Sequence, residues 1–392
     1  MVVQRTVDVI IPVYNQLDCV KTCVESVIKA SVFNEYEIIV IDDASTESGV
    51  TEYLQAKDRG GLITLFRNEL NLGFTGTVNF GMGLHSDRDV LLLNSDTYVH
   101  SSWAERMRRA AYSDRDIATV SPLTNASHIS NYPNRGSNDG IALEVTDDVL
   151  DDLAADSNRG RYIDVHTNVG FCMFIKRESL DSVGLFDRVN FPVGYGEESD
   201  FCYRTRKLGW RHVVAGDVFV RHFEGQSFGE RKRQLMQEMF GRFDRLHPEC
   251  GRLDERFTRL DPLRGLRANM DLARIRRLVQ PGNAIKLYVI RDHSEIAGIR
   301  DAVALLYFVD GQYMQLATRD SRIFPNLERY IVPRDTVKFN AAMEYIDVNT
   351  ILCASEAELS LIKQRVSAKR DEIDFGPTLA LAKTFEGVGS GA

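Results

Sequence analysis

The sequence predicts an α/β fold whose first 230 residues form a doubly wound sheet. Apolar runs rich in β-branched residues appear as VDVIIPVY, YEIIVIDD and DVLLLNSD, and a helical pattern separates the first two. Continuous runs of this kind are typical of parallel strands covered by helices on both faces. With 392 residues and 44% hydrophobic content, the chain is also long enough for one large domain and a smaller one.

The elements of this first part follow in order along the chain. After the strand that begins at residue 7 we expect a helix over 17–30, a second strand in YEIIVIDD, a strand over 62–67, a helix over 73–84 and a strand over 89–94. Residues 121–140, rich in Asn, Ser, Gly and Pro, predict a long loop. The acidic stretch 144–156 keeps Val149, Leu150 and Leu153 at helical spacing, so we expect a helix whose carboxylates face solvent.

The remaining sequence divides into three parts. A compact region rich in Gly and Phe covers 169–228, a basic helical stretch follows it, and Pro281-Gly282 marks a boundary. Beyond that boundary the runs IKLYVIRD, ALLYFVD, RYIVP and NTILCAS alternate with helical segments such as 356–369, which predicts a small α/β unit. We therefore expect a domain over 1–230, a helical extension over 231–281, and a unit over 282–392 that is small or is the opening part of a second domain.

Charge and cysteine content limit which binding partners and which cellular compartment fit the sequence. The net charge is −8, yet residues 231–277 carry 13 Lys or Arg against 7 Asp or Glu, which fits either a solvated helical face or contact with anionic lipid. No run of about 20 apolar residues and no signal-peptide pattern is present, so we expect a cytoplasmic protein, at most at the inner face of the plasma membrane. The six cysteines lack CxxC pairing, which predicts neither disulfides nor zinc.

Polar residues directly after the predicted strands are the first candidates for chemistry, because ligands of such sheets bind beyond the carboxyl ends of the strands. Asp96 follows a buried strand, where one carboxylate with waters and a diphosphate can hold a hard divalent cation. Asp96 equally fits a cap on a helix around Trp103. Asp43 follows the second strand, where it can line the same crevice as Tyr14 or belong to a turn with a helix cap.

Two further groups of residues have the composition of a reaction centre. Glu197, Glu198 and Asp200 crowd three carboxylates into four positions at the start of a predicted helix, which raises the pKa of at least one of them, although helix capping explains them too. His222 follows an apolar run, where an imidazole either completes a metal site or serves a structural role.

Seven motifs in order resemble the inverting family-two glycosyltransferases with the GT-A fold, in particular those that build bacterial surface polysaccharides. These motifs cover roughly residues 6–230: VDVIIPVYN, EIIVIDDAS, NLGFTGTVNFG, LLLNSDTYV, VGFCMFIKRESLDSVGLFD, GEESDFCYRTRKLGW and VRHFEG. The resemblance implies a mixed, doubly wound sheet that binds a nucleotide sugar, followed here by the helical segment and the small unit.

The resemblance also assigns roles to residues of this chain. It implies Mg²⁺ or Mn²⁺ at Asp96, with Asn94 and Ser95 at the other two positions of a reduced DxD motif, and His222 as a second metal ligand. It implies Glu198 as the catalytic base, with Asp200 in reserve and Glu197 beside it. The implied donor-binding residues are Pro12, Tyr14, Asp43, Asn71, Gly73, Phe74 and Asn79.

The expected reaction is inverting transfer of a sugar from dTDP-rhamnose or a UDP-hexose to a hydroxyl of a growing surface glycan of the O-antigen or capsule type. Partners are then the nucleotide sugar and a glycan or lipid-linked acceptor, without nucleic acid. A sugar nucleotidyltransferase is disfavoured because VIIPVYNQLD lacks a Gly-rich basic loop, and a dehydrogenase because GxGxxG does not follow the first strand. A catalytically silent carbohydrate-binding or scaffold subunit remains the alternative from another class.

Overall fold

A computed structural model of the chain describes residues 7–30, 36–136, 141–223 and 230–278, together with parts of 285–377. Its contacts divide the chain into two compact units. Unit 1 comprises residues 1–139 and 146–263, and unit 2 comprises 140–145 and 264–392. All the candidate site residues named above belong to unit 1.

Unit 1 alternates strands and helices, as the sequence predicts. Its strands are β1 Val7–Val13, β2 Tyr36–Asp42, β3 Thr64–Arg67, β4 Asp89–Leu93, β5 Thr97–Tyr98, β6 Ile117–Thr124, β7 Tyr162–Val165, β8 Cys172–Ile175 and β9 Arg211–His222. Its helices are α1 Leu17–Ala30, α2 Val50–Arg59, α3 Gly73–Met82, α4 Trp103–Ala111, α5 Asp147–Ser157, α6 Arg177–Val183, α7 Glu197–Arg206, α8 Glu230–Leu246 and α9 Cys250–Leu260.

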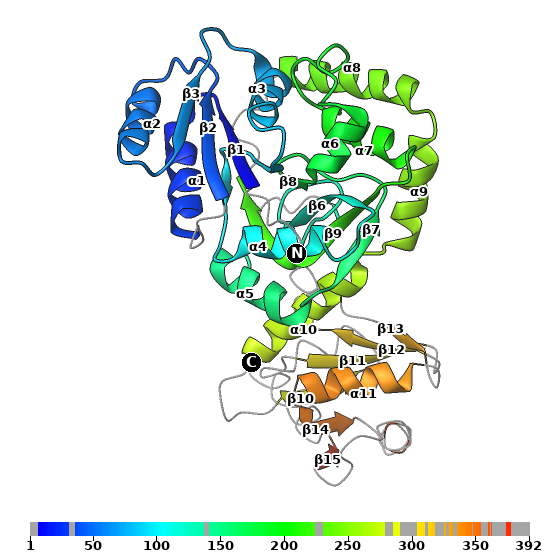
Figure 1. Ribbon diagram of the computed structural model, residues 1–392. Coiled ribbons are helices and arrows are strands. Elements are labelled where there is room, and N and C mark those ends of the chain that lie inside the picture. Colours follow the sequence, from blue (N-terminus) through cyan, green and yellow to red (C-terminus); the bar gives the residue numbers. More distant parts are fainter. Residues whose placement is uncertain are drawn as a thin grey trace, which may run out of the picture. The chain divides into compact units, whose positions relative to one another are not determined.

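The nine strands of unit 1 form one mixed sheet in the order β3-β2-β1-β4-β8-β6-β9-β5, with β7 paired to β9 (Figure 1). Strands β3, β2, β1 and β4 run parallel to one another, whereas β8 runs antiparallel to both β4 and β6. This arrangement brings the carboxyl ends of β1, β2 and β4 to one edge of the sheet. That edge is where a doubly wound sheet binds its ligands.

Helices cover both faces of this sheet, which confirms the doubly wound mixed α/β architecture. One core cluster joins the sheet to α1, α2 and α4 through side chains such as Val24, Leu54 and Met107. The other joins it to α3, α6 and α7 through Val78, Leu180 and other apolar residues. Burial on both faces explains why strands such as DVLLL in β4 are apolar at every position after the first.

One expectation for this part of the chain is wrong, and the solvated acidic helix forms as expected except at one carboxylate, since Asp148, Asp152 and Asp156 are exposed. Residues 121–124 belong to β6 instead of a loop, because Ser121 and Pro122 pair with β9 and tertiary pairing outweighs the loop-like composition. The loop continues over 125–136, and residues 137–140 lie outside the described part. On α5, Asp151 is 2% exposed and accepts hydrogen bonds from Arg106 and from the Phe219 amide, so it does not face solvent.

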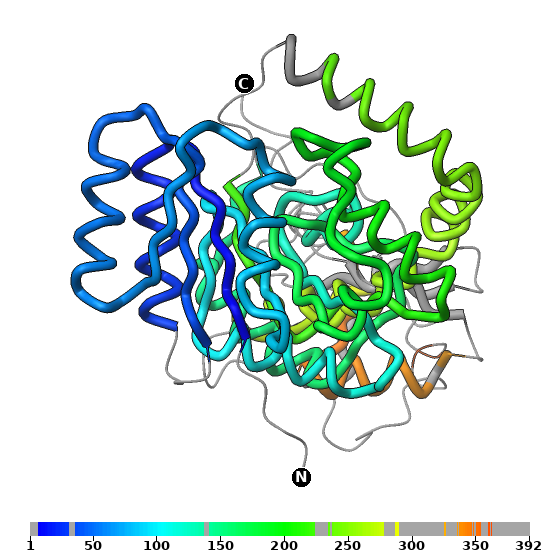
Figure 2. Tube along the Cα trace, turned by 45° about the horizontal axis from the view of Figure 1, so that its top comes forward, coloured from blue at the N-terminus to red at the C-terminus, as the bar shows by residue number. Residues whose placement is uncertain are grey.

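Helices α8 and α9 pack at the outer side of α7. Met239 and Phe243 of α8 contact Tyr203 of α7 and the nearby Phe191. Figure 2 shows α8 in yellow-green outside the green helices of unit 1. Over the residues that the structure describes, none of the helices has the length and apolar content needed to cross a membrane.

Unit 2 contains its own six-stranded sheet, which confirms a small α/β unit towards the end of the chain. The strand order is β13-β12-β11-β10-β14-β15. The predicted helix over 356–369 lies almost wholly outside the described residues. The elements of this unit are α10 Arg264–Leu278, β10 Ile285–Ile290, β11 Ala304–Val309, β12 Tyr313–Ala317, β13 Arg329–Ile331, α11 Thr336–Tyr345, β14 Val348–Cys353 and β15 Asp374–Pro377.

Candidate active site

The turn after β2 is built by two adjacent carboxylates. Asp42 accepts a hydrogen bond from the Ser45 amide, as a turn-forming Asp does, and its other oxygen accepts from Thr51 and Arg67. The turn interpretation of this motif is therefore right for Asp42. It does not cap a helix, because α2 begins only at Val50 with Gly49 as its N-cap residue.

Asp43 organises the loop before α3. Its carboxylate accepts hydrogen bonds from the Asn68 side chain at 2.7 Å and from the amides of Leu72 and Gly73 at 2.8 and 3.0 Å. A carboxylate has about four acceptor positions, so these bonds leave about one for a ligand. Gly73 adopts φ +72°, and a Cβ there would lie 2.9 Å from the Pro192 carbonyl oxygen, which restricts this position to glycine.

The other predicted donor-binding residues differ in exposure. Tyr14, just after β1, is 49% exposed, and Asn71 is also exposed, so both present their side chains to solvent near this edge. Pro12 and Phe74 are half-buried. Asn79 lies further along α3, where its amide group bonds the Phe186 main chain through both of its polar atoms, at 2.8 and 3.1 Å. That pairing ties α3 to the segment before α7.

Asp96 does not cap the following helix, so that alternative is wrong. Strand β5 follows Asp96 directly, and the N-cap residue of α4 is Ser102. Because β5 pairs antiparallel with the end of β9, Thr97 lies opposite His222. His222 Nε2 then lies 3.3 Å from Asp96 Oδ1, with side-chain exposures of 9% and 29%. The structure thus brings together the two residues predicted as metal ligands.

The hydrogen bonds of His222 fix its tautomer. Its Nδ1 lies 3.1 Å from the Ala126 carbonyl oxygen, which only accepts, so Nδ1 carries a proton and donates it. In the neutral ring, Nε2 therefore presents a lone pair towards the Asp96 carboxylate. Two electron-rich atoms at this separation require a second ring proton or a metal cation between them. The donor set, one imidazole nitrogen and one carboxylate, fits Mg²⁺ or Mn²⁺ with further oxygen ligands.

The other two positions of the Asn94-Ser95-Asp96 triplet lie between β4 and β5. The Asn94 amide donates to the Phe171 carbonyl at 2.7 Å, while its side-chain Oδ1 is buried with no hydrogen-bond partner. Ser95 is half-buried. A buried amide oxygen without a partner is uncommon in proteins, and it leaves an acceptor available at this end of β4.

Glu197 and Glu198 open helix α7. Gly196 precedes them with φ +128°, and a Cβ there would lie 3.0 Å from the Phe191 ring. Glu197 is 3% exposed, and burial, together with the neighbouring Glu198 carboxylate, raises the pKa of Glu197 well above its ordinary value. Glu198 is half-buried, and its Oε2 has no hydrogen-bond partner. The carboxylate crowding thus acts on the pKa of Glu197.

Asp200, one turn further along α7, is held on both oxygens. Arg204 Nε donates to Oδ2 at 2.6 Å, and His247 Nε2 lies 2.8 Å from Oδ1. The Asp200 and His247 side chains are 5% and 4% exposed. This carboxylate therefore links α7 to the segment between α8 and α9, and the surrounding contacts favour a structural role for it.

The dipeptide Gly170-Phe171 connects Glu198 with the Asp96–His222 pair. A Cβ on Gly170 would lie 3.5 Å from Cβ and Cγ of Glu198, so the Glu198 side chain packs directly on this glycine. The Phe171 ring stacks on His222, with centroids 4.8 Å apart and planes 14° from parallel. Glu198 and the Asp96–His222 pair thus contact consecutive residues of the chain.

Comparison with known proteins supports the fold of this part of the chain. The model of the family described as Glycosyl transferase family 2 matches residues 8–184, which run from β1 to the end of α6. This segment is therefore similar to glycosyl transferase family 2. The GT-A fold expected from the motifs is confirmed, with α8, α9 and the small sheet of unit 2 as additions to it.

Individual relatives share limited stretches of sequence with this chain. Glycosyltransferase AglE of Haloferax volcanii is 25% identical over 232 residues, which cover 57% of this chain and 68% of that protein. The poly(ribitol-phosphate) beta-glucosyltransferase of Bacillus spizizenii is 30% identical over 97 residues, 24% of this chain and 15% of the relative. An uncharacterized glycosyltransferase of Haemophilus influenzae is 29% identical over 101 residues, 26% of this chain and 31% of its own length.

Two solved structures are similar at low sequence identity. The mannosyltransferase PcManGT from Pyrobaculum calidifontis, in complex with GDP-Man and Mn²⁺, is 17% identical with a TM-score of 0.45 over 71% of this chain and 76% of that one. Staphylococcus aureus TarS 1–349 in complex with UDP-GlcNAc is 14% identical with a TM-score of 0.41 over 70% of this chain and 82% of that one.

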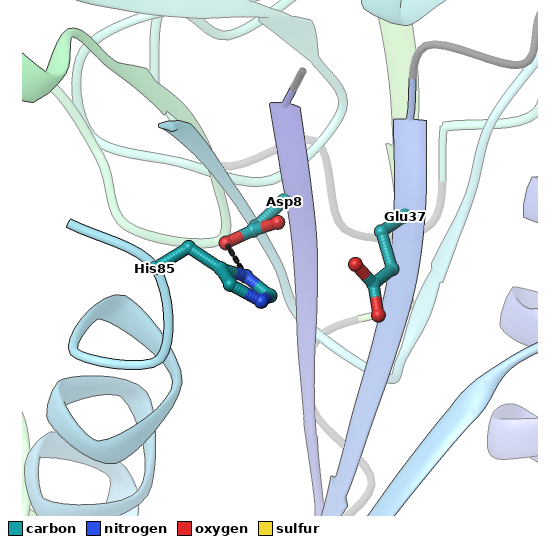
Figure 3. A group of neighbouring side chains, drawn as sticks. All are labelled: Asp8, Glu37 and His85. Carbon is teal, nitrogen blue, oxygen red and sulfur yellow. Dashed lines mark hydrogen bonds and ion pairs between the residues drawn. The ribbon is translucent and has the colours of Figure 1, made fainter. Parts of the chain in front are cut away.

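A second group of potential metal ligands lies at the other edge of the family 2 sheet. Asp8, Glu37 and His85 gather near the amino ends of β1 and β2 (Figure 3). Arg88 Nη1 donates to Asp8 at 3.1 Å and to Glu37 at 2.5 Å, while His85 Nδ1 lies 2.9 Å from Asp8. Because a guanidinium already neutralises these carboxylates, we interpret the group as a structural ion-pair cluster, remote from the strand ends that bear Asp96.

The sequence did not reveal His247 as a residue that supports the candidate site. It lies 47 residues from Asp200, in the basic stretch between α8 and α9. Its only sequence signal is a lone histidine before a proline, in LHPEC.

Proposed function

We propose that this chain is an inverting glycosyltransferase that moves a sugar from a nucleoside-diphosphate donor to a hydroxyl group of an acceptor glycan. The observation that carries the proposal is the contact of Glu198 and His222 with the consecutive residues Gly170 and Phe171, with Asp96 facing His222. A candidate base thereby lies beside a candidate cation site. Sugar transfer needs both, since one group takes a proton and the other stabilises a leaving diphosphate.

In this proposal the donor lies along the carboxyl edge of β1, β2 and β4. Pro12 and the exposed Tyr14 contact the base, and Asp43 contributes chiefly by holding the loop with Asn71, Gly73 and Phe74 in place. Asn79 supports this pocket from within α3. From the sequence resemblance we propose dTDP-rhamnose or a UDP-hexose as the donor.

Glu198 acts as the base in the proposed reaction. It takes the proton of the acceptor hydroxyl while that oxygen attacks the anomeric carbon from the face opposite the diphosphate. The bond from the anomeric carbon to the diphosphate oxygen breaks, its electron pair leaves with the nucleoside diphosphate, and the anomeric configuration inverts. Burial and the neighbouring Glu198 carboxylate raise the pKa of Glu197, which favours the protonated form of Glu197.

Asp96 and His222 would hold Mg²⁺ or Mn²⁺, with the Asn94 and Ser95 side chains close by. When bound, such a cation supplies Lewis-acid stabilisation for the charge that develops on the diphosphate. The protein's part is to fix the His222 ring, through the hydrogen bond to Ala126 and the stack on Phe171, so that Nε2 points at Asp96.

For the acceptor we propose a growing bacterial surface glycan of the O-antigen or capsule type, free or lipid-linked, with rhamnosyl transfer as the leading candidate. The basic segment 231–277 would place the enzyme at the inner face of the plasma membrane. Exposed apolar side chains among its arginines support this proposal, since Phe240 and Leu246 are 48% and 41% exposed and Leu260 is 60% exposed.

Product analysis tests the proposal. The purified chain is incubated with UDP-, dTDP- and GDP-sugars, with or without a glycan acceptor and with or without EDTA. We expect one donor to release nucleoside diphosphate only when acceptor and divalent metal are both present. Formation of a nucleoside triphosphate from a nucleotide sugar and pyrophosphate would indicate a nucleotidyltransferase instead. Saturable glycan binding without release from any donor would indicate a silent binding subunit.

A further inference from the structure

A cavity of about 460 Å³ lies at the end of α7 that is opposite to Glu198. Its walls come from the end of β7, the start of β9, the end of α7 and helix α9, all within unit 1. The volume is in the range of pockets that hold small ligands. Residue 206 is eight positions after residue 198 in α7, which is about 12 Å along the helix. The cavity is therefore separate from the candidate active site.

The cavity has an excess of positive charge. Of its three arginines, Arg211 is neutralised by Asp164 and Asp114 at 2.7 to 3.0 Å. Arg206 donates to the His166 carbonyl and lies over the Tyr203 ring, so its guanidinium faces no carboxylate in these contacts. Arg256, on the exposed side of α9, completes the lining. Two guanidinium groups without a matching carboxylate favour an anionic ligand.

His166 forms part of the cavity wall. Its Nε2 lies 2.5 Å from the Asp254 carboxylate, which accepts, so Nε2 carries the proton. Its Nδ1 is buried and has no hydrogen-bond partner. The His166 side chain is only 6% exposed, so Nδ1 has no contact with solvent and contributes to the wall of the cavity by packing alone.

Two aromatic side chains complete the lining. Trp210 is half-buried at the start of β9, and Phe257 of α9 packs against His166 with ring centroids 5.1 Å apart. Aromatic faces with a polar rim bind flat, partly apolar surfaces such as the C–H face of a sugar ring. The cavity therefore combines an apolar face and two cationic donors.

We propose that this cavity binds an anionic saccharide, with its sugar ring on Trp210 and its anionic group on Arg206 and Arg256. The anionic group is the phosphate of a sugar phosphate or the carboxylate of a uronic acid, which offer the same chemistry to guanidinium groups. If the chain acts as proposed above, the ligand is a segment of the acceptor remote from the reacting hydroxyl; that role rests on the proposed function, whereas binding itself does not.

Tryptophan fluorescence of the full chain tests this proposal. The chain has two tryptophans, and Trp103 is 1% exposed, so a ligand-dependent change reports on Trp210. Glucose 1-phosphate, glucuronic acid and neutral glucose are titrated in the presence of saturating UDP, which blocks the donor site. We expect saturable binding of an anionic sugar and none of glucose. The anionic sugar that binds with the lower dissociation constant shows whether the cavity prefers a phosphate or a carboxylate.

Variants on α9 sharpen the test. Arg256→Gln should weaken binding of the anionic sugar about tenfold, the loss expected for one charge-assisted hydrogen bond. Arg252→Gln, an exposed arginine on the same helix outside the cavity lining, should bind as the wild type does. Absence of saturable binding by both anionic sugars, or equal affinities of the two variants, would overturn the proposal. Because no transfer is measured, failure here is distinct from failure of the proposed activity.

Discussion

His222 Nε2 lies 3.3 Å from Asp96 Oδ1, although 126 positions separate the two residues in the sequence. Pairing of β5 with the end of β9 brings them together, and the hydrogen bond from Nδ1 to Ala126 turns the second ring nitrogen towards the carboxylate. The contact explains how a triplet with a single carboxylate can hold a divalent cation.

His222→Ala should raise the Mn²⁺ concentration needed for half-maximal activity by about tenfold or more, because even partners of metal ligands contribute that much to affinity. The measurement is a Mn²⁺ titration of nucleoside diphosphate release. His128→Ala, an exposed histidine in the loop after β6, is the matched control. An unchanged metal requirement in the His222 variant would remove this histidine from the metal site.

Glu198→Gln should lower turnover by about 10²- to 10⁴-fold, which is the contribution of a positioned base, while the affinity for the nucleotide sugar stays nearly constant. Turnover comes from steady-state kinetics and affinity from calorimetry with the donor. Glu178→Gln on α6 is an exposed control of the same chemistry. If the Glu198 variant turns over at the wild-type rate, another group is the base.

The raised pKa of Glu197 predicts how the free energy of unfolding depends on pH. In the folded protein the pKa of Glu197 is raised above the unfolded value near 4.5, so the unfolded chain releases this proton first. The contribution of Glu197 to the free energy of unfolding is therefore fully present below about pH 4.5 and is lost as the pH rises towards the folded pKa. In Glu197→Gln, urea midpoints should fall less from pH 5 to pH 8 than in the wild type. Parallel curves would contradict this assignment.

His247→Ala should destabilise unit 1, because it leaves one oxygen of the buried Asp200 without its partner. The expected loss is about 1–3 kcal/mol of the free energy of unfolding. Urea denaturation followed by circular dichroism measures it, and His128→Ala is again a suitable control. A stability equal to that of the control would show that the contact between Asp200 and His247 does not contribute to the free energy of unfolding.

The sequence predicts the sheet and the location of the site for a physical reason. Apolar β-branched runs identify parallel strands, and the carboxyl ends of such strands meet at one edge, so Asp43 and Asp96 are expected near each other. The sequence does not predict what these side chains bind. Asp43 holds its own loop, which depends on the path of residues 68–73.

Tertiary contacts explain the remaining differences. SPLT has the composition of a loop but pairs with β9 as part of β6. The acidic helix α5 buries Asp151 because Arg106 reaches it from α4. His247 binds Asp200 across 47 residues, a contact that no local pattern encodes. The raised pKa expected among three carboxylates belongs to Glu197, since burial, which the sequence leaves open, is its largest cause.

Asp96→Ala tests the proposed metal-dependent transfer most directly. The measurement is the rate of nucleoside diphosphate release with donor and acceptor as Mn²⁺ is titrated, for the wild type, for Asp96→Ala and for Asp152→Ala, an exposed aspartate on α5. We predict that Mn²⁺ activates the wild type and the control, and that Asp96→Ala is slower by at least about 100-fold at every concentration, because Lewis-acid stabilisation is worth several kcal/mol. An Asp96 variant with the rate and metal response of the wild type would contradict the proposal that Asp96 holds a catalytic metal ion.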